Sequence, residues 1–262
     1  MLLDEMSVAE INKAVYADFD TIRNSSTQSR LEHDYLQLRK KLNIPKNEVY
    51  PVFNTIKTKT KNHWLMLTAK CLDSPSIKSI EDVATGYYIY YHNHKGFRVF
   101  NSCNENSLLV YNGHLFTRYR ERMNLTITDP IEIIKQFFLH NYAEPVFREF
   151  DNKDENGGIP FMTVEKDGYL VGSIQHYPNN ITWTVHRTFI PHLNANTKYT
   201  EFKSQVQLMA AKEVLNYKLG IISELSEASK RLAVLYGLLD KEITNNFLEH
   251  LIEDINAGKS TM

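Results

Sequence analysis

Three side chains suited to phosphate chemistry recur at helical spacing near the middle of the chain. His114, Arg118 and Arg122 lie four residues apart, so on a helix they form one basic stripe that drifts only about 40° per step. An imidazole exchanges protons near neutral pH, and the planar guanidinium of arginine pairs with two phosphate oxygens at once. This spacing predicts a site for an anionic ligand, above all a phosphodiester.

Two predicted elements must position this stripe. Residues 108–111 (LLVY) are typical of an apolar strand, and Asn112-Gly113 predicts a turn from which a helix begins at His114. An apolar face runs beside the stripe on this helix and consists of Leu115, Phe116, Tyr119 and Met123. We expect this face to hold the helix against a sheet.

A second candidate site lies on the strand predicted at residues 181–190. Alternate side chains of a strand point to opposite faces of its sheet. One face of this strand is polar and carries Thr182, Thr184, His186 and Thr188. The other face carries Ile181, Trp183, Val185, Arg187 and Phe189. A histidine among threonines is typical of a solvent-facing surface or of a shallow polar site.

Lysines provide a further basic surface near the start of the strand-rich region. Lys57, Lys59 and Lys61 alternate with Thr58 and Thr60, which places three ammonium groups on one face if the segment is extended. Such a row is typical of a solvated edge strand that resists aggregation. It would also suit contact with phosphates, so these lysines are candidates for binding nucleic acid.

The composition is that of an ordinary globular protein. The chain has 262 residues, 42% of them hydrophobic and 23% charged, with a formal net charge of −1, so nucleic-acid binding would depend on local patches.

Two isolated cysteines favour a reducing compartment, and no apolar run is long enough for a membrane span. The acidic N-terminus does not resemble a signal peptide, and a cytoplasmic location is expected.

No cofactor or metal is expected. His92 and His94 lie at a predicted hairpin tip and have no evident third ligand, whereas metal sites need ligands that converge with a defined geometry.

The order of patterns predicts an α+β fold, with an antiparallel sheet, helices packed on it, and helical N- and C-terminal segments. N-terminal helices are expected over residues 1–50, an α+β core with the His/Arg helix over 51–192, and a C-terminal helical segment over 193–262, packed as one compact unit. The C-terminal helices are rich in apolar residues, and we expect part of this surface to form a homodimer contact.

Residues 108–192 resemble the ribonuclease toxin families grouped with barnase, EndoU, the colicin nucleases and RelE. The resemblance lies in the helix with His114, Arg118 and Arg122, which is followed by a helix and by strands that end in the threonine-rich one with His186 and Thr188. It implies metal-independent cleavage of RNA.

In such a reaction a base takes the proton of the 2′-hydroxyl, and the freed oxygen attacks the adjacent phosphorus. The chemistry assigns acid/base work to His114, and phosphate binding to Arg118 and Arg122. His186 is the candidate for the complementary acid or base, and Thr188 or Tyr199 for orienting it.

Two alternatives to a ribonuclease remain open at this point. The stripe could bind nucleic acid, with Arg120 among its contacts, or grip an acidic protein partner as a non-catalytic adaptor. It could also be a solvated helix face, because Glu121 lies between Arg120 and Arg122 and such charges usually pair with one another. Convergence of His114 and His186 in one cleft would favour the enzyme, and separation would favour the adaptor.

Overall fold

The computed structural model describes residues 2, 5–25, 33, 36, 37, 40, 52–70, 83–93, 96–141, 147–150, 152–240 and 242–258. Its centre is a nine-stranded sheet in the order β1-β2-β3-β4-β5-β9-β8-β7-β6. The strands are β1 (Val52–Lys57), β2 (His63–Lys70), β3 (Val83–Asn93), β4 (Gly96–Asn104), β5 (Ser107–Asn112), β6 (Phe147–Glu149), β7 (Ile159–Val164), β8 (Gly168–Tyr177) and β9 (Ile181–Pro191). The helices are α1 (Val8–Ser25), α3 (Gly113–Arg122), α4 (Pro130–His140), α5 (Thr197–Lys218), α6 (Glu227–Leu235) and α7 (Asn245–Asn256).

The α+β class and the joining of both strand-rich regions in one sheet agree with the sequence prediction. The sheet is not wholly antiparallel, because β5 and β9 run parallel, with Leu108 beside Trp183 and Tyr111 beside His186. The reason is that β5 leads into α3 rather than into a hairpin, and the chain returns only after α4, β6, β7 and β8. A parallel pair needs such a long crossover.

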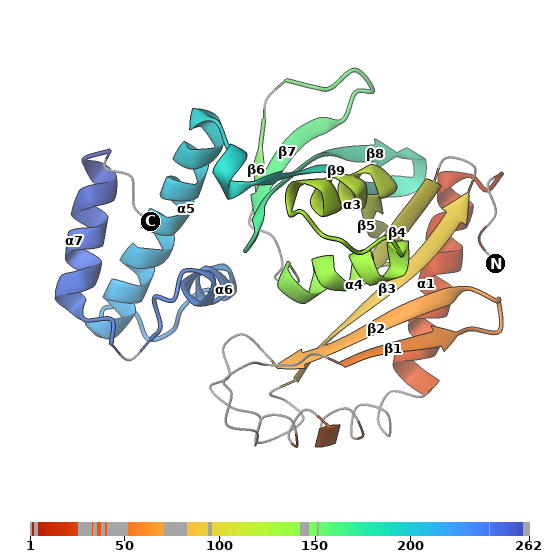
Figure 1. Cartoon of the computed structure of the whole chain (residues 1–262), viewed down its shortest axis with the longest axis horizontal. Helices are drawn as coiled ribbons and strands as arrows, with labels where there is room; N and C mark the ends of the chain where they lie inside the picture. Colours follow the sequence, from red (N-terminus) through yellow and green to blue (C-terminus); the bar gives the residue numbers. More distant parts are fainter. Residues whose placement is uncertain are drawn as a thin grey trace.

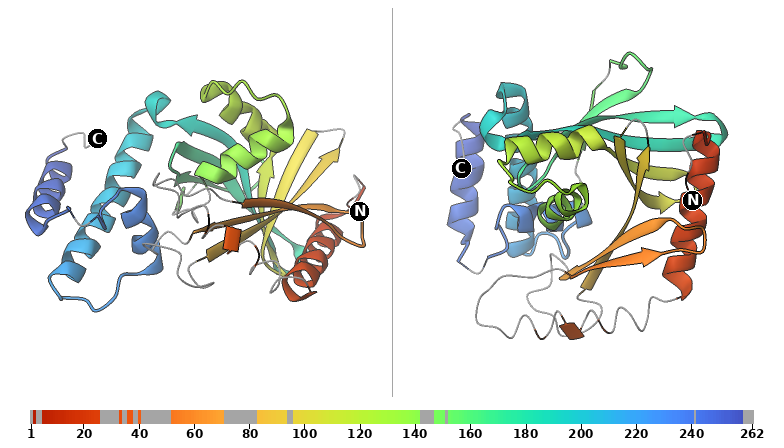
Figure 2. Two further views of the ribbon diagram at one scale, coloured as in Figure 1. Left: turned by 60° about the horizontal axis from the view of Figure 1, so that its bottom comes forward. Right: turned by 45° about the vertical axis from the view of Figure 1, so that its right-hand side comes forward.

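Helices cover both faces of the sheet, as Figures 1 and 2 show. On one face Ile11, Val15 and Ile22 of α1 pack on a core that includes Trp64 and Trp183. On the other face α3 and α4 pack on a core of mostly aromatic side chains. This core includes Tyr88, Tyr111, Phe116, Tyr119, Phe137, Phe138 and Phe189.

A third core joins the C-terminal helices to the far end of the sheet. It contains Met162 of β7 and Tyr169 of β8 together with Phe202 of α5, Leu232 of α6 and Leu248 of α7. In Figure 1 these helices lie at one end of the molecule, beyond β6 and β7.

A buried carboxylate fixes α1 to the β1–β2 hairpin. Asp18 of α1 is 4% exposed, and it accepts hydrogen bonds from Thr58 Oγ1 at 3.0 Å, Thr60 Oγ1 at 2.8 Å and Asn62 Nδ2 at 2.7 Å. The indole nitrogen of Trp64 donates to the same carboxylate at 3.4 Å. Residues 58–62 therefore form a loop that wraps around one anion.

This loop corrects the prediction of an extended lysine row. β1 ends at Lys57, and Lys59 and Lys61 lie in the hairpin loop, where Lys61 has a φ of +64°. All three lysines are exposed, but they do not share one face of a strand. The threonines between the lysines set the geometry of the loop, because their hydroxyls turn inward and donate to Asp18.

A β-bulge corrects the predicted faces of β9. The register shifts between Val171 and Gly172 of β8, so that Thr188 pairs with Val171 and His186 pairs with Gly172. Beyond this bulge Phe189 lies in the core under α3, whereas Trp183 and Val185 lie in the core under α1. Strict alternation along the sequence could not show the shift, because the extra residue of a bulge reverses the faces that follow it.

Replacing Asp18 with alanine should lower the free energy of unfolding by roughly 2–4 kcal/mol, because several buried donors would lose one shared acceptor. Urea unfolding measures this loss, and Lys13→Ala on the exposed side of the same helix is the control. An Asp18→Ala change no larger than that of Lys13→Ala would contradict this role.

Candidate functional site

His114 and Arg118 lie together on the outer surface of α3. His114 is exposed, and its Nε2 accepts a hydrogen bond of 3.3 Å from Arg118 Nε. Arg118 Nη1 also forms an ion pair of 2.9 Å with Glu121, and both of these side chains are more than 40% exposed. The predicted cationic surface is thus partly paired within its own helix.

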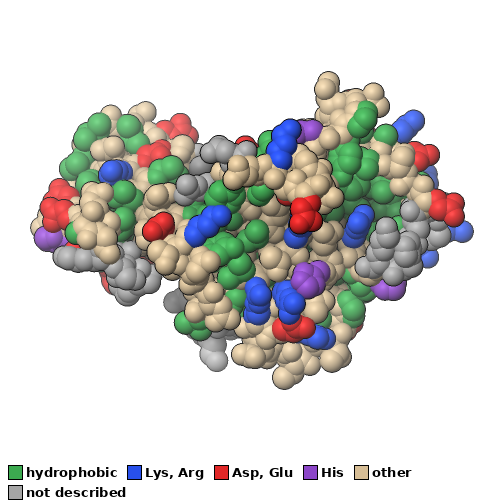
Figure 3. Space-filling view, turned by 90° about the horizontal axis from the view of Figure 1, so that it is seen from above, with side chains coloured by type: hydrophobic (Ala, Val, Ile, Leu, Met, Phe, Trp, Pro, Cys, Tyr) green, Lys and Arg blue, Asp and Glu red, His purple; other side chains and the backbone are tan. Residues whose placement is uncertain are grey.

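Arg122, the third member of the stripe, contacts the sheet. Its Nη1 donates to the carbonyl oxygen of Phe189 on β9, so it ties the end of α3 to the sheet. Arg120 is half-buried on the same helix. On the side of the molecule that Figure 3 shows, basic side chains are interspersed with acidic ones and do not form one continuous basic patch.

His186 lies inside the core, apart from the exposed His114. It is 0% exposed. Its ring stacks on that of Tyr111, with the ring centroids 4.5 Å apart, and is perpendicular to that of Phe161, with the ring centroids 5.2 Å apart. Neither ring nitrogen has a hydrogen-bond partner among the described residues. Burial lowers the pKa of His186 to about 3, so the ring is neutral and closed off from solvent.

The structure therefore brings His114 and Arg118 together but does not add His186 to them. Thr188 is half-buried and pairs with Val171 on β8. A threonine-rich strand suggested an open polar surface, but β9 lies between β5 and β8 in the sheet, and α3 and α4 cover the core beside it.

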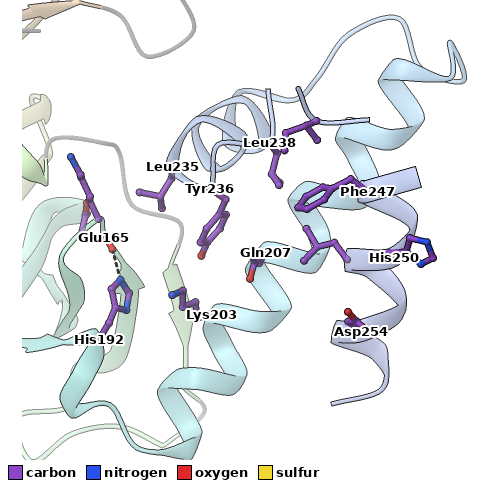
Figure 4. Close-up of a pocket in the computed structure, with 13 residues that line it drawn as sticks. Glu165, His192, Lys203, Gln207, Leu235, Tyr236, Leu238, Phe247, His250 and Asp254 are labelled. Atoms are coloured by element: carbon purple, nitrogen blue, oxygen red, sulfur yellow. Dashed lines mark hydrogen bonds between the residues drawn. The ribbon is translucent and has the colours of Figure 1, made fainter. Parts of the chain in front are cut away.

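A cavity of about 600 Å³ opens between the β7–β8 turn and the C-terminal helices. Its wall includes Glu165 from the turn, His192 from a short 3-10 helix (His192–Asn194), Lys203 from α5 and Tyr236 beyond α6 (Figure 4). The apolar part of the wall consists of Leu235, Leu238, Ile243, Phe247 and Leu251. None of these residues was a candidate from the sequence.

Three buried polar atoms of this wall have no hydrogen-bond partner among the described residues. They are Glu165 Oε2, His192 Nδ1 and the hydroxyl of Tyr236. Buried polar atoms are nearly always paired, and an unpaired one costs about 1–3 kcal/mol. These atoms belong to residues that line one cavity, which makes this cavity a candidate site for the polar group of a ligand.

The protonation of His192 follows from its hydrogen bond. Its Nε2 lies 3.1 Å from the carbonyl oxygen of Glu165, which can only accept, so Nε2 carries the proton. Burial, with the nearby charge of Lys203, lowers the pKa of His192 and favours the neutral ring. Its Nδ1 is consequently a hydrogen-bond acceptor.

The other ionisable groups of the wall are also shifted by burial. The pKa of Glu165 lies well above its ordinary value, because the carboxyl is 2% exposed and Asp167 is nearby. Burial lowers the pKa of the Lys203 ammonium and raises that of the Tyr236 phenol. Shifted groups gathered in a concave site are typical of functional sites.

A hydrogen-bond cluster holds the turn that carries Glu165. The Asp167 carboxylate accepts from the Tyr119 hydroxyl at 2.8 Å, from Asn141 Nδ2 at 3.1 Å and from His140 Nδ1 at 3.2 Å. Asp167 N in turn donates to Asn141 Oδ1 at 3.2 Å. The α3–α4 layer thus fixes the position of one wall of the cavity.

Within the described part of the chain, no group of histidine, cysteine and acidic side chains is arranged to hold a metal ion. Among the same residues, no helix is long and apolar enough to span a membrane. His94, of the His92–His94 pair, lies outside the described residues.

Comparisons with protein-family models, with curated proteins and with solved structures found no match. The function is therefore inferred from the geometry of the outer surface of α3 and of the cavity beside the C-terminal helices.

We expect His186 to make the protein sensitive to acid. The folded state holds the ring neutral down to a pKa of about 3, against an ordinary value of 6.5, so the unfolded state binds more protons between these values and stability falls as the pH falls. From pH 7 to pH 4 the wild type should lose roughly 2–3 kcal/mol more than His186→Leu, at about 1.4 kcal/mol per pKa unit.

Urea unfolding at several pH values measures this difference, and His176→Leu, at an exposed position on β8, is the control. Equal losses in wild type and His186→Leu would contradict the buried, unpaired histidine.

Proposed function

We propose that this protein binds a small molecule in the cavity between the β7–β8 turn and the C-terminal helices. The observation that supports this most strongly is that Glu165 Oε2, His192 Nδ1 and the Tyr236 hydroxyl are buried around one cavity without partners among the described residues. A ligand that supplies partners for these atoms would contribute hydrogen bonds that the described residues do not.

The dimensions of the cavity agree with this proposal. Ligand pockets usually measure about 300–1,000 Å³ and combine an apolar lining with a few placed polar groups. The cavity has about 600 Å³, which suits an organic molecule better than a single ion. Binding is the activity proposed, and no reaction is assigned to the site.

We predict that filling the cavity abolishes binding. Leu251→Trp places an indole in the apolar part of the wall, whereas Glu249→Trp adds the same ring at an exposed position of α7. Ligand-observed NMR with a library of small organic molecules should give hits for the wild type and Glu249→Trp, and at least tenfold weaker binding for Leu251→Trp. An absence of hits, or hits that Leu251→Trp leaves unchanged, would overturn the proposal.

RNA binding by α3 is the second candidate function, in keeping with the toxin resemblance. It is favoured by the exposure of His114 and by the partial exposure of Arg118 and Arg120 on one helix. A ribonuclease would need an acid or base other than His186 to work with His114, since His186 is sealed in the core. We therefore favour binding without cleavage as the form of this proposal.

Arg118→Ala tests this second candidate. It should weaken RNA binding and reduce the slope of log affinity against log salt by about one, because one phosphate contact is lost. Fluorescence anisotropy with a labelled single-stranded RNA at several salt concentrations measures both, and Lys212→Ala, an exposed site on α5, is the control. Equal effects of the two substitutions, or no RNA binding at low salt, would remove the candidate. Cleavage that His114→Ala abolishes would instead restore the ribonuclease.

A homodimer through the C-terminal helices also remains a proposal. It is supported by large apolar side chains that are exposed on this part of the chain, namely Met209, Tyr217, Leu219, Ile221 and Phe247.

A further inference from the structure

The wall of the cavity has two chemically different ends. The polar groups of Glu165, His192 and Lys203 lie on the side of the sheet and of α5, whereas Leu238 and Phe247 lie on the side of the last two helices (Figure 4). A ligand that satisfies both ends must itself have a polar head and an apolar body.

The polar end favours a negatively charged head. Lys203 is half-buried and forms no ion pair among the described residues. Burial raises the pKa of the Glu165 carboxyl in the same wall, which favours the uncharged form and so leaves less negative charge to compensate the lysine. Asp254 lies on α7, at the opposite side of the cavity in Figure 4.

Hydrogen-bonding groups at this end define the head further. The Tyr236 hydroxyl, a donor, has no hydrogen-bond partner among the described residues, and Figure 4 shows it pointing toward the region of Lys203. An ammonium and a phenol donate together to the two oxygens of a carboxylate. His192 Nδ1 is an acceptor and would pair with a hydroxyl of the ligand beside that carboxylate.

The apolar end favours an alkyl chain. Leu235, Leu238, Ile243, Phe247 and Leu251 come from α6, α7 and the segment between them. Each buried methylene gains about 0.8 kcal/mol, so a chain of several carbons would contribute much of the binding free energy, and the head would contribute selectivity.

We propose that the cavity binds an amphiphilic monocarboxylate, with its carboxylate on Lys203 and Tyr236 and its alkyl chain among the leucines and Phe247. This inference rests on the proposed small-molecule function and specifies the ligand class of the same site.

Isothermal titration calorimetry with decanoate and decanol, both below their aggregation concentrations, tests this class on the full chain. Decanoate should bind at least tenfold more tightly than decanol, about 1.4 kcal/mol, through its charged head. Lys203→Met should remove this preference by weakening decanoate alone, Lys203→Arg should keep it, and Lys212→Met on the exposed side of α5 should leave it unchanged. β-Hydroxydecanoate should bind more tightly than decanoate.

Decanol that binds as well as decanoate, with both lost in Leu251→Trp, would overturn the anionic head and leave the small-molecule cavity standing. A preference for decanoate over decanol that persists in Lys203→Met would also overturn the proposal that Lys203 binds an anionic head group. If neither probe binds while other library compounds still depend on Leu251, the ligand class is wrong and the cavity function holds. If no compound at all depends on Leu251, both proposals fall.

Discussion

The parallel pairing of β5 with β9 is the constraint on which the rest of this structure depends. It joins the β1–β5 meander to the β6–β9 segment in one sheet. Because β5 leads directly into α3, the same pairing places α3 over β9, where Arg122 donates to the carbonyl oxygen of Phe189. β9 then leads through His192, a residue of the cavity wall, into α5. The pairing of β5 with β9 therefore also sets the position of this part of the wall.

Features that depend on neighbours in sequence were predictable. Ser7 and Glu10 have the sequence spacing of a capping box, and in the structure Ser7 N donates to Glu10 at 2.8 Å and Glu10 N to Ser7 Oγ at 3.4 Å. Asp129-Pro130 is likewise a local signal for a helix start, and Asp129 accepts from Ile131 N at 2.9 Å with Pro130 as the first residue of α4. Caps and turns are decided within a few residues, which is why the sequence pattern indicates them, as it indicates the α+β class.

Features that depend on distant contacts were not predictable. His186 was read as part of an open polar face, because neither the bulge in β8–β9 nor the cover of α3 and α4 has a signature near it. Glu165 follows an apolar strand and precedes the Lys166–Gly168 turn, where an acid is ordinarily solvated, yet it is only 2% exposed in the folded protein. The cavity combines residues up to about ninety positions apart, from Glu165 to Asp254, so no local motif marks it.

The C-terminal helices form one side of a cavity whose wall holds buried polar groups without partners among the described residues, and the titration of Glu165 tests this arrangement most directly. Its pKa in the folded state lies above the ordinary 4.5, so the folded state binds more protons than the unfolded state above that pH, and stability falls as the pH rises. The decisive measurement is the free energy of unfolding of wild type and Glu165→Gln from pH 4 to pH 8. The wild type should lose stability relative to Glu165→Gln as the pH rises. Parallel profiles would show that Glu165 is solvated and would contradict its burial in the wall of the cavity.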